Sequence, residues 1–357
     1  MSQHLFTPGP TPLPAAVTAR LREEPPYHRG PEADALFASV HGQLKKVFFT
    51  QQPVLVLGCS GTGGVEAAML NTLTPDDRVM VFDNGRFAKR WALMLSSLGI
   101  PCIRIPVTPG LPVTEDIVVE SLRRNPGCSA VWVVHCETST GTVSDIRTVA
   151  SAVREHSDAL MCVDAVSSIG VHELRMDAWA LDVVVASSQK GLTSPAGLAV
   201  VSLSDRAWMR ARSLERNRTM YFDLMAARAA YDRNRTPWTP AMLLVMALDT
   251  SLGLLIDEGL PQVWERHGRT ADAVRNALVD AGFALFSASP ADALTAVLLP
   301  DKLPDIVDRL KIDYGITVAR GQDALARSIF RIGHIGPYTV DDVAFVAGAC
   351  RSLLHST

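Results

Sequence analysis

Leu160-Met-Cys-Val-Asp164 and Val183-Val-Val-Ala-Ser-Ser-Gln-Lys190 decide the fold of this chain of 357 residues. Each stretch is an apolar run followed by a charged side chain, an acid in the first and a lysine in the second. Such runs predict buried parallel strands, because helices cover both faces of a parallel sheet. The carboxyl ends of these strands are where open α/β sheets bind ligands. The sequence therefore predicts that Asp164 and Lys190 lie together at one edge of a sheet.

Strands and helices alternate around these two runs from about residue 53. The other expected strands are 54–57, 79–82, 102–105, 130–134 and 198–202. The expected helices between them are 63–72, 86–98, 115–124 and 146–155. This alternation predicts the α/β class, with a mostly parallel sheet flanked by helices.

The remainder of the chain predicts an arm and a second, smaller unit. After residue 202 the pattern becomes helical, up to a long apolar helix at 241–256. Beyond it we expect helices at 261–281, 302–313 and 339–354, and strands at 284–287, 295–299, 316–318 and 329–332. Residues 7–14 are rich in proline, which interrupts helices, and predict an extended arm. Because the chain is too long for one ordinary core, we expect an N-terminal arm (1–14), a large domain (15–256) and a small C-terminal α+β domain (257–357).

Composition argues against several classes of protein. A formal net charge of −3 gives no electrostatic reason to expect a nucleic acid or an anionic membrane as partner. The six cysteines show neither C-x-x-C nor zinc-site spacing, so we expect no disulfide framework and no metal. The sequence shows no signal peptide and no apolar stretch long enough to span a membrane. We therefore expect a cytoplasmic protein.

Asp164 and Lys190 suggest a specific chemistry. A buried carboxylate is costly without a cation beside it, so Asp164 either pairs with a ligand cation or caps a helix. Burial of Lys190 would lower the pKa of its amine and free it to attack a carbonyl, whereas an exposed lysine would have no such role. Pyridoxal phosphate (PLP) requires both groups: an amine that condenses with its aldehyde and a carboxylate that keeps its pyridine nitrogen protonated.

Gly58-Cys-Ser-Gly-Thr-Gly-Gly64 lies between an expected strand and an expected helix. Amides at a helix N-terminus, with the hydroxyls of Ser60 and Thr62, favour a phosphate. A simple glycine-rich turn is the alternative. The loop is not a P-loop, since no Gly-Lys-Ser/Thr follows, and Glu66 replaces the last glycine of a dinucleotide fingerprint.

Three further residues are candidates for the site. The ring of Phe87 can stack on a planar cofactor or pack in the core. The hydroxyl of Thr138, which follows the strand at 130–134, can bind a ligand or cap a turn. Arg331 lies in an apolar strand without a nearby acid in the sequence, so it either binds a substrate carboxylate or pairs with a distant Asp or Glu.

Together these motifs resemble the class V (fold type I) PLP-dependent aminotransferases, in particular the alanine/serine–glyoxylate and serine–pyruvate group. The resemblance covers essentially the whole chain. It rests on the order and spacing of the motifs Thr7-Pro-Gly-Pro10, Ser60-Gly-Thr-Gly63, Asn84-Gly-Arg-Phe87, Glu137-Thr-Ser-Thr-Gly141, Val163-Asp-Ala-Val-Ser167, Ser188-Gln-Lys190, Thr236-Pro-Trp-Thr-Pro240 and Phe330-Arg-Ile-Gly-His334.

The resemblance implies a role for each candidate. Lys190 would be the Schiff-base lysine and the catalytic proton shuttle. The cofactor-binding residues would be Asp164 at the pyridine nitrogen, Phe87 stacked on the ring, Thr138 at the ring hydroxyl, and Ser60, Gly61, Thr62 and Gln189 at the phosphate. Thr239 would reach that phosphate from the partner subunit, which implies a homodimer with composite sites. Arg331 would bind the substrate α-carboxylate near Gly9 of the arm.

The chain departs from the family pattern at three places. Phe87 stands where some members have Trp, and Thr236 stands where some have Tyr, so the phosphate contact of that Tyr is not expected from the same side chain here. Arg320 stands where some relatives have Gly, and we consider selectivity for acidic side chains from Arg320 or Arg29 only as a hypothesis.

The function that this resemblance implies is a PLP-dependent transaminase. It would move an amino group from alanine, serine or aspartate to glyoxylate or pyruvate by a ping-pong mechanism. The alternatives are a PLP-dependent lyase or desulfurase, an NAD-dependent enzyme, and a non-catalytic subunit that kept the fold. For a desulfurase the sequence offers no cysteine on an evident mobile loop, and Cys350 falls in an expected helix.

Overall fold

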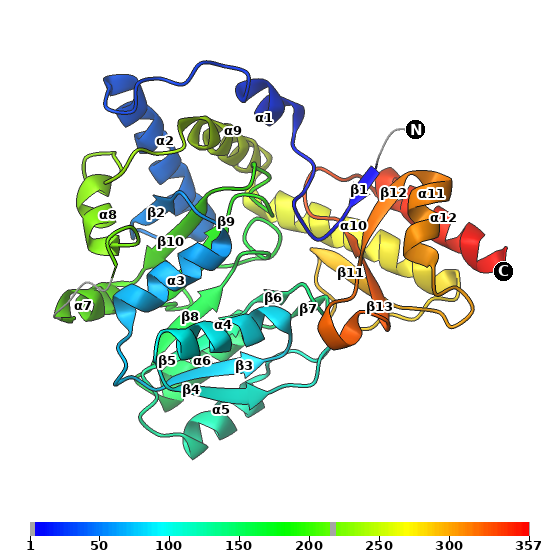
Figure 1. Ribbon diagram of the computed structural model, residues 1–357, viewed down its shortest axis with the longest axis horizontal. Helices are drawn as coiled ribbons and strands as arrows, with labels where there is room; N and C mark the ends of the chain where they lie inside the picture. Colours follow the sequence, from blue (N-terminus) through cyan, green and yellow to red (C-terminus); the bar gives the residue numbers. More distant parts are fainter. Residues whose placement is uncertain (1–3, 215–218, 357) are drawn as a thin grey trace.

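The molecule is built around a large, mostly parallel sheet, as the sequence predicts (Figure 1). The computed structural model describes residues 4–214 and 219–356. Within these residues, seven strands form this sheet in the order β2-β10-β9-β8-β5-β3-β4. Their bounds are β2 (Val54–Leu57), β3 (Val79–Asp83), β4 (Cys102–Pro106), β5 (Ala130–Val134), β8 (Leu160–Asp164), β9 (Val183–Ser187) and β10 (Ala199–Leu203). Only β10 runs antiparallel to its neighbours in this part of the chain, so both quoted runs are interior parallel strands.

Helices cover both faces of this sheet. One face packs against α2 (Pro31–Phe48), α5 (Glu115–Arg124), α6 (Ile146–His156) and α9 (Met242–Glu258). The other packs against α3 (Gly61–Thr72), α4 (Arg86–Ser97), α7 (Asp205–Ser213) and α8 (Leu224–Tyr231). Side chains alternate between the faces along each strand, so Met161 and Val163 of β8 join the first core and Leu160 and Cys162 the second. Burial on both sides explains why the strand is apolar throughout.

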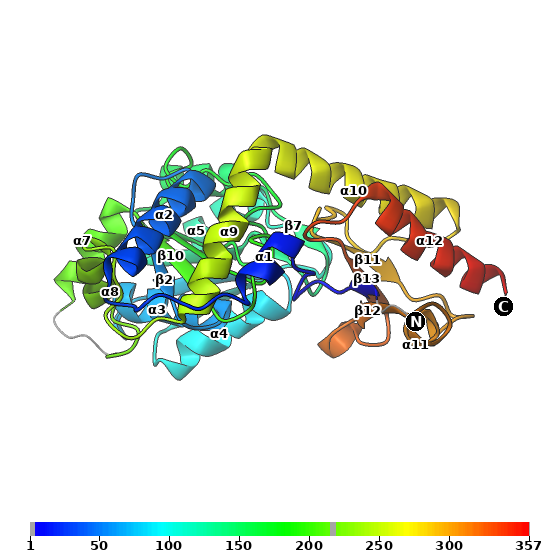
Figure 2. The same ribbon diagram turned by 90° about the horizontal axis from the view of Figure 1, so that it is seen from above.

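A second sheet lies beside the first and is covered by α10 and α12 (Figures 1 and 2). In the described chain its order is β1-β12-β13-β11. The bounds are β1 (His4–Phe6), β11 (Leu294–Leu298), β12 (Ile316–Arg320), β13 (Ile329–Gly333), α10 (Leu260–Asp280), α11 (Ile306–Tyr314) and α12 (Val340–His355). The remaining elements are α1 (Ala15–Arg20), the hairpin of β6 (Cys136–Glu137) and β7 (Thr142–Val143), and the short helix η1 (Asp323–Leu325). The boundary expected near residue 256 falls in the last turn of α9, just before α10 begins.

Two sequence predictions in this region are wrong. The strand expected at 284–287 is reduced to a single bridge between Leu285 and Val297. Ala284 and Phe286 still make backbone hydrogen bonds to β11, but from Ser287 on the side chains bond to the β6–β7 hairpin instead, so the pairing stops there. The helix expected at 302–313 begins only at Ile306, after a turn.

The N-terminal arm begins as a strand, which the sequence did not predict. His4–Phe6 pairs in parallel with β12, and the ring of Phe6 stacks on Tyr338 at 4.9 Å between centroids. The arm then passes directly over Gly333 of β13. A Cβ atom at Gly333 would lie 2.1 Å from the Thr7 carbonyl oxygen, so glycine is required for this close approach.

None of the helices within residues 4–214 and 219–356 is both long and apolar enough to cross a membrane.

Gly333→Ala should therefore displace the arm and destabilise the protein by about 1–3 kcal/mol, the usual range for overpacking. The matched control is Gly348→Ala in α12, where a Cβ meets no atom within 4 Å and a helical alanine stabilises by about 0.5–1 kcal/mol. Urea unfolding of the two variants measures the difference. A Gly333→Ala protein as stable as the control would contradict this packing.

Candidate active site

A cavity of about 240 Å³ opens where the large sheet ends. The residues around this cavity lie at or after the carboxyl ends of β2, β3, β5, β8 and β9. The residues that line it are Ser60, Gly61, Thr62, Phe87, Arg90, Trp91, Val134, Cys136, Asp164, Val166, Ser167, Gln189 and Lys190. Seven of the predicted site residues thus share one cavity, whereas Gly9, Thr138, Thr239 and Arg331 do not line it.

Asp164 is the last residue of β8 and is only 3% exposed. The Trp91 indole N–H donates to Oδ2 at 2.9 Å, and the Val166 amide donates to Oδ1 at 2.9 Å. Burial raises the pKa of this carboxyl to about 6, although the two donors oppose the rise. Because the residues that follow Asp164 form turns, the alternative role of Asp164 as a helix N-cap is wrong.

Lys190 lies three residues beyond β9, and it is one of the residues that line the cavity. Its ammonium group donates to the carbonyl of Pro8 in the arm. A Cβ at the neighbouring Gly9 would lie 2.6 Å from Nζ, so the arm closely covers the amine. Burial lowers the pKa of Lys190 to about 8. These contacts argue against an exposed surface lysine.

The opposite end of the cavity is the N-terminus of α3. The helix begins at Gly61, two residues earlier than predicted, and Ser60 is its N-cap, accepting from the Gly63 amide at 3.5 Å. The first amides of a helix have no intrahelical acceptor and favour an anion. A Cβ at Gly61 would lie 2.7 Å from the Val166 side chain, so the wall of the cavity tolerates only glycine here. Gln189 adds a buried Oε1 without a hydrogen-bond partner among the described residues.

Phe87 forms one wall of the cavity and also packs against the core between the sheet and α4. Its position is set by Glu137, a fully buried carboxylate that the sequence analysis had not singled out. Glu137 accepts from the amides of Phe87 and Ala88 at 2.9 and 3.2 Å, and from the Ser139 amide and hydroxyl at 3.0 and 2.6 Å. A carboxylate on the first amides of α4 also complements the helix dipole. Glu137 therefore anchors the helix that presents Phe87.

Thr138 and Arg331 lie together at the junction of the two sheets. Thr138 is buried in the turn of the β6–β7 hairpin, and its carbonyl accepts from Arg331 at 2.8 Å. Arg331, in β13, donates twice to the Arg320 carbonyl, at 3.0 and 2.8 Å. Among the described residues no carboxylate pairs with Arg331, so a structural salt bridge is not found there. Burial lowers the pKa of this guanidinium to about 10.

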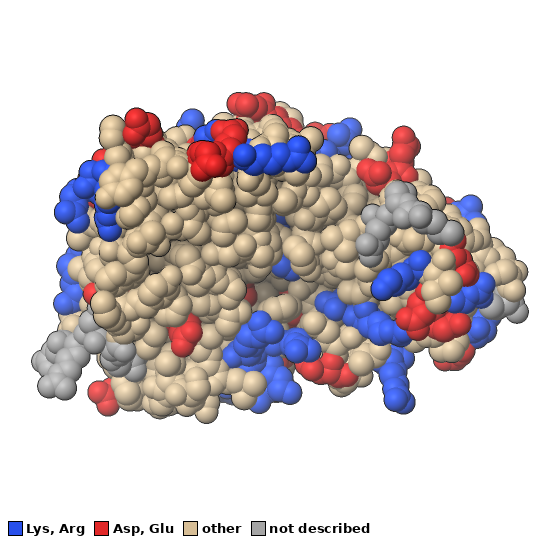
Figure 3. All heavy atoms as spheres, turned by 45° about the horizontal axis from the view of Figure 1, so that its top comes forward, with Lys and Arg blue, Asp and Glu red and all other residues tan. Residues whose placement is uncertain are grey.

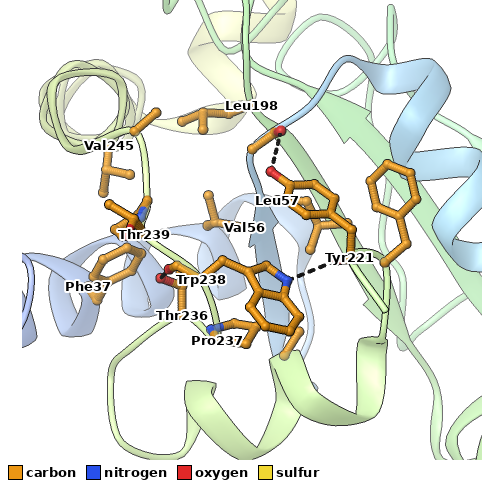
Figure 4. Close-up of a pocket in the computed structure, with 15 residues that line it drawn as sticks. Phe37, Val56, Leu57, Leu198, Tyr221, Thr236, Pro237, Trp238, Thr239 and Val245 are labelled. Atoms are coloured by element: carbon orange, nitrogen blue, oxygen red, sulfur yellow. Dashed lines mark hydrogen bonds between the residues drawn. The ribbon is translucent and has the colours of Figure 1, made fainter. Parts of the chain in front are cut away.

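Thr239 is exposed and lines a neighbouring pocket rather than the Lys190 cavity (Figure 4). In that pocket the Tyr221 hydroxyl donates to the Gly58 carbonyl at 3.2 Å, and the Trp238 indole donates to the Tyr221 carbonyl at 3.0 Å. Gly58 lies three residues before Gly61, the first residue of α3. The pocket therefore lies next to the α3 end of the Lys190 cavity.

Arg90 and Trp91 are two of the six cavity residues that the sequence did not predict, besides Val134, Cys136, Val166 and Ser167. Arg90 donates to the Thr62 hydroxyl at 3.2 Å, and its guanidinium lies 5.0 Å from the centre of the Phe87 ring. Both residues follow Phe87 at helical spacings of three and four, which place them on the same face of α4. That periodicity was the available signal. Glu137 gave none, because its partners in α4 are about 50 residues away in sequence.

Two hypotheses on charged residues at the mouth of the site receive no support from the structure. The Arg320 guanidinium pairs with Asp308 of α11 at 2.6 Å. Arg29 donates to the Thr236 carbonyl at 3.3 Å.

Comparison with known proteins gives consistent matches. The family model described as Aminotransferase class-V matches residues 4–338. A "Soluble hydrogenase 42 kDa subunit" of Anabaena cylindrica is 40% identical over 93% of this chain and 88% of that protein. A serine–glyoxylate aminotransferase of Methylorubrum extorquens is 33% identical over 99% and 91%. An L-aspartate–glyoxylate aminotransferase of Paracoccus denitrificans is 35% identical over 94% and 87%. A crystal structure of a Thermus thermophilus aspartate aminotransferase of subgroup IV superimposes with a TM-score of 0.92 at 30% identity, covering 99% of both chains.

The depressed pKa of Lys190 makes a direct prediction. In the cofactor-free protein its amine should react with trinitrobenzenesulfonate as the neutral form appears, so the rate should rise with pH around a midpoint near 8. Peptide mapping identifies the modified lysine. In urea the midpoint of the same residue should move toward the ordinary value of about 10.4. A midpoint that does not change on unfolding would show that burial does not tune this amine.

Proposed function

The chain belongs to the class-V aminotransferase family, and on this basis we propose that it transfers the amino group of a small L-amino acid to glyoxylate or pyruvate. Like the rest of this family, the enzyme is a PLP-dependent transferase. The proposed donors are alanine, serine or aspartate, and the proposed order is ping-pong. Serine, aspartate and glyoxylate appear in the names of the relatives. The observation that carries the proposal is the buried Lys190 amine in the same cavity as the buried Asp164 carboxyl.

The cavity suits PLP at each end. The first amides of α3 and the hydroxyls of Ser60 and Thr62 offer hydrogen-bond donors for a phosphate. Asp164, with a pKa raised to about 6 by burial, would be stabilised as a carboxylate by a protonated ring nitrogen. When bound, PLP supplies an aldehyde to carry the amino group and a ring that accepts electrons.

Each residue then has a proposed task. Lys190 holds the cofactor covalently and moves a proton at the substrate α-carbon, which suits an amine whose pKa of about 8 is close to working pH. Asp164 keeps the ring nitrogen protonated. Phe87 stacks on the ring and Thr138 contacts the ring hydroxyl. Ser60, Gly61, Thr62 and Gln189 hold the phosphate. Arg331 binds the substrate α-carboxylate, while backbone at Gly9 helps to exclude water from Lys190.

The alternative of a desulfurase is less well supported. Cys350 is fully buried in α12, and burial raises the pKa of its thiol to about 12. Cys136 lines the cavity, but burial holds the pKa of its thiol far above the ordinary value. Neither residue is poised as the thiolate that sulfur transfer requires. A subunit without catalytic function is suggested only by the names of two relatives, which call them soluble hydrogenase subunits.

We further propose a cytoplasmic homodimer in which the Thr239 of each subunit reaches the phosphate site of its partner. All six cysteines are free, which suits a reducing compartment. The exposed position of Thr239, in a pocket adjoining the α3 N-terminus, supports a contribution across an interface.

Lys190→Ala should abolish transfer activity, with a loss of at least about a thousandfold, because one residue supplies both the covalent link and the proton transfer. The wild-type protein loaded with PLP should be yellow, and borohydride should fix the colour to the peptide containing Lys190. The control is Lys311→Ala, an exposed lysine of α11, which should keep both properties. A Lys190→Ala protein that retains covalent colour would refute the assignment.

The composite site predicts complementation between subunits. Thr239→Ala should weaken PLP binding about tenfold, the effect of losing one hydrogen bond of about 1.4 kcal/mol. Co-expressed with Lys190→Ala, it should regain tight binding at half of the sites, since one site then has both residues intact. Equilibrium dialysis of the separately tagged, purified mixed dimer measures this occupancy. If Thr239 acts within its own chain, the mixed dimer has no tight site.

A further inference from the structure

Arg86, the first residue of α4, lies beside the substrate end of the site. Its amide donates to the Ser139 hydroxyl at 2.9 Å. Arg331 donates to the carbonyl of the preceding residue, Thr138, at 2.8 Å. The two arginines are therefore anchored on consecutive residues of one turn. The charge of Arg86 contributes to the lowered pKa of Arg331, as expected for two neighbouring cations.

Few negative charges balance this pair. The buried Glu137 carboxylate is already engaged by the amides of α4 and by Ser139. Arg331 is held by carbonyls, with the Gln322 amide oxygen at 3.5 Å. Arg86 pairs with Asp323 of η1, with 3.1 Å between the guanidinium and Oδ1. The local arrangement thus holds two guanidinium groups and one readily accessible carboxylate.

In the Arg86–Asp323 ion pair, a ligand carboxylate can replace the carboxylate of Asp323. The side chains are 39% and 53% exposed, respectively, and exposed ion pairs of this kind contribute only about 0–1 kcal/mol. Asp323 has a positive φ of 49°, a conformation that residues other than glycine seldom adopt. A ligand carboxylate that forms a bidentate contact with Arg86 would therefore displace Asp323 at small cost.

Two other arginines lie near the site. Arg90 lies at the α3 end of the cavity, against Thr62 and the ring of Phe87. Arg320 pairs with Asp308 of α11, and this ion pair is as exposed as Arg86–Asp323, so the strength of the ion pair does not distinguish the two arginines. Lys and Arg side chains do gather beside a hollow on one face of the molecule (Figure 3), but charge alone does not select a residue. Arg86 is selected because it shares the β6–β7 turn with Arg331.

We propose that Arg86 binds the side-chain carboxylate of a dicarboxylic amino donor while Arg331 binds its α-carboxylate, with Asp323 as the internal carboxylate that the substrate replaces. This inference rests on the proposed function and specifies its substrate class as a short acidic L-amino acid. Arginine suits this task because its planar fork binds a carboxylate bidentately.

The first experiment measures binding without turnover. Succinate, which carries two carboxylates, and butyrate, which carries one, are titrated calorimetrically into the PLP-loaded enzyme. Arg86→Gln should weaken succinate binding at least tenfold while changing butyrate binding less than threefold. Asp323→Asn should strengthen succinate binding about threefold, since the competing carboxylate is lost. The control is Arg327→Gln, an exposed arginine after η1, which should change neither ligand.

The second experiment compares amino donors. Arg86→Gln should lower the ratio of kcat/KM for aspartate to that for alanine at least tenfold, and Arg86→Lys should restore part of it. Equal losses for both donors, or succinate binding weakened as much by Asp323→Asn as by Arg86→Gln, would make the pair a structural latch and overturn the proposal. If no donor is converted, the proposed function fails, while the succinate titration still tests Arg86 by itself.

Discussion

Burial of an amine and a carboxyl at the same sheet edge is the constraint on which the rest of the structure depends. Folding removes Lys190 and Asp164 from water, and burial shifts the two pKa values toward each other, to about 8 and about 6. Both shifts arise because burial disfavours the charged forms of the amine and the carboxyl. A cationic ring beside Asp164 would favour its charged form and so lower the pKa that burial raises. Ligand binding and local stability are therefore coupled at this edge.

The helix α4 is the second organising element. Glu137 and Ser139 fix its N-terminus by accepting from the first three amides of the helix. The first two turns of the helix present Phe87 and Arg90 to the cavity, and Trp91 donates to Asp164. One buried carboxylate thus sets the positions of an aromatic wall, a cation and the donor that orients Asp164. Four hydrogen bonds offset part of the cost of burying Glu137, although burial still raises the pKa of its carboxyl.

The large sheet could be predicted because its information is local. The runs ending at Asp164 and Ser187 carry their burial in their composition, and the glycine loop lies directly between a strand and a helix. Contacts between residues far apart in the sequence could not be predicted, because no local pattern indicates them. The pairing of His4–Phe6 with β12 joins residues more than 300 positions apart, and Glu137 meets α4 across 50 residues. The segment at 284–287 has strand-like composition, yet its pairing with β11 ends at Ser287, whose hydroxyl bonds to Thr142 of the β6–β7 hairpin. Thr239 lies in a separate pocket of its own chain, so its predicted contact with the phosphate stays a prediction.

The N-terminal arm contacts both the small sheet near Arg331 and Lys190 of the large sheet. Its first residues extend the small sheet through β12, and Thr7 then packs on Gly333, two residues after Arg331. The next residues, Pro8 and Gly9, cover the amine of Lys190, which belongs to the large sheet. The proposed anchor for the substrate α-carboxylate and the cover over the amine are therefore parts of one packed unit. Any movement of the small sheet that brings Arg331 toward a substrate also moves the cover, so carboxylate binding and exclusion of water from Lys190 are coupled through the backbone of β1 and β13.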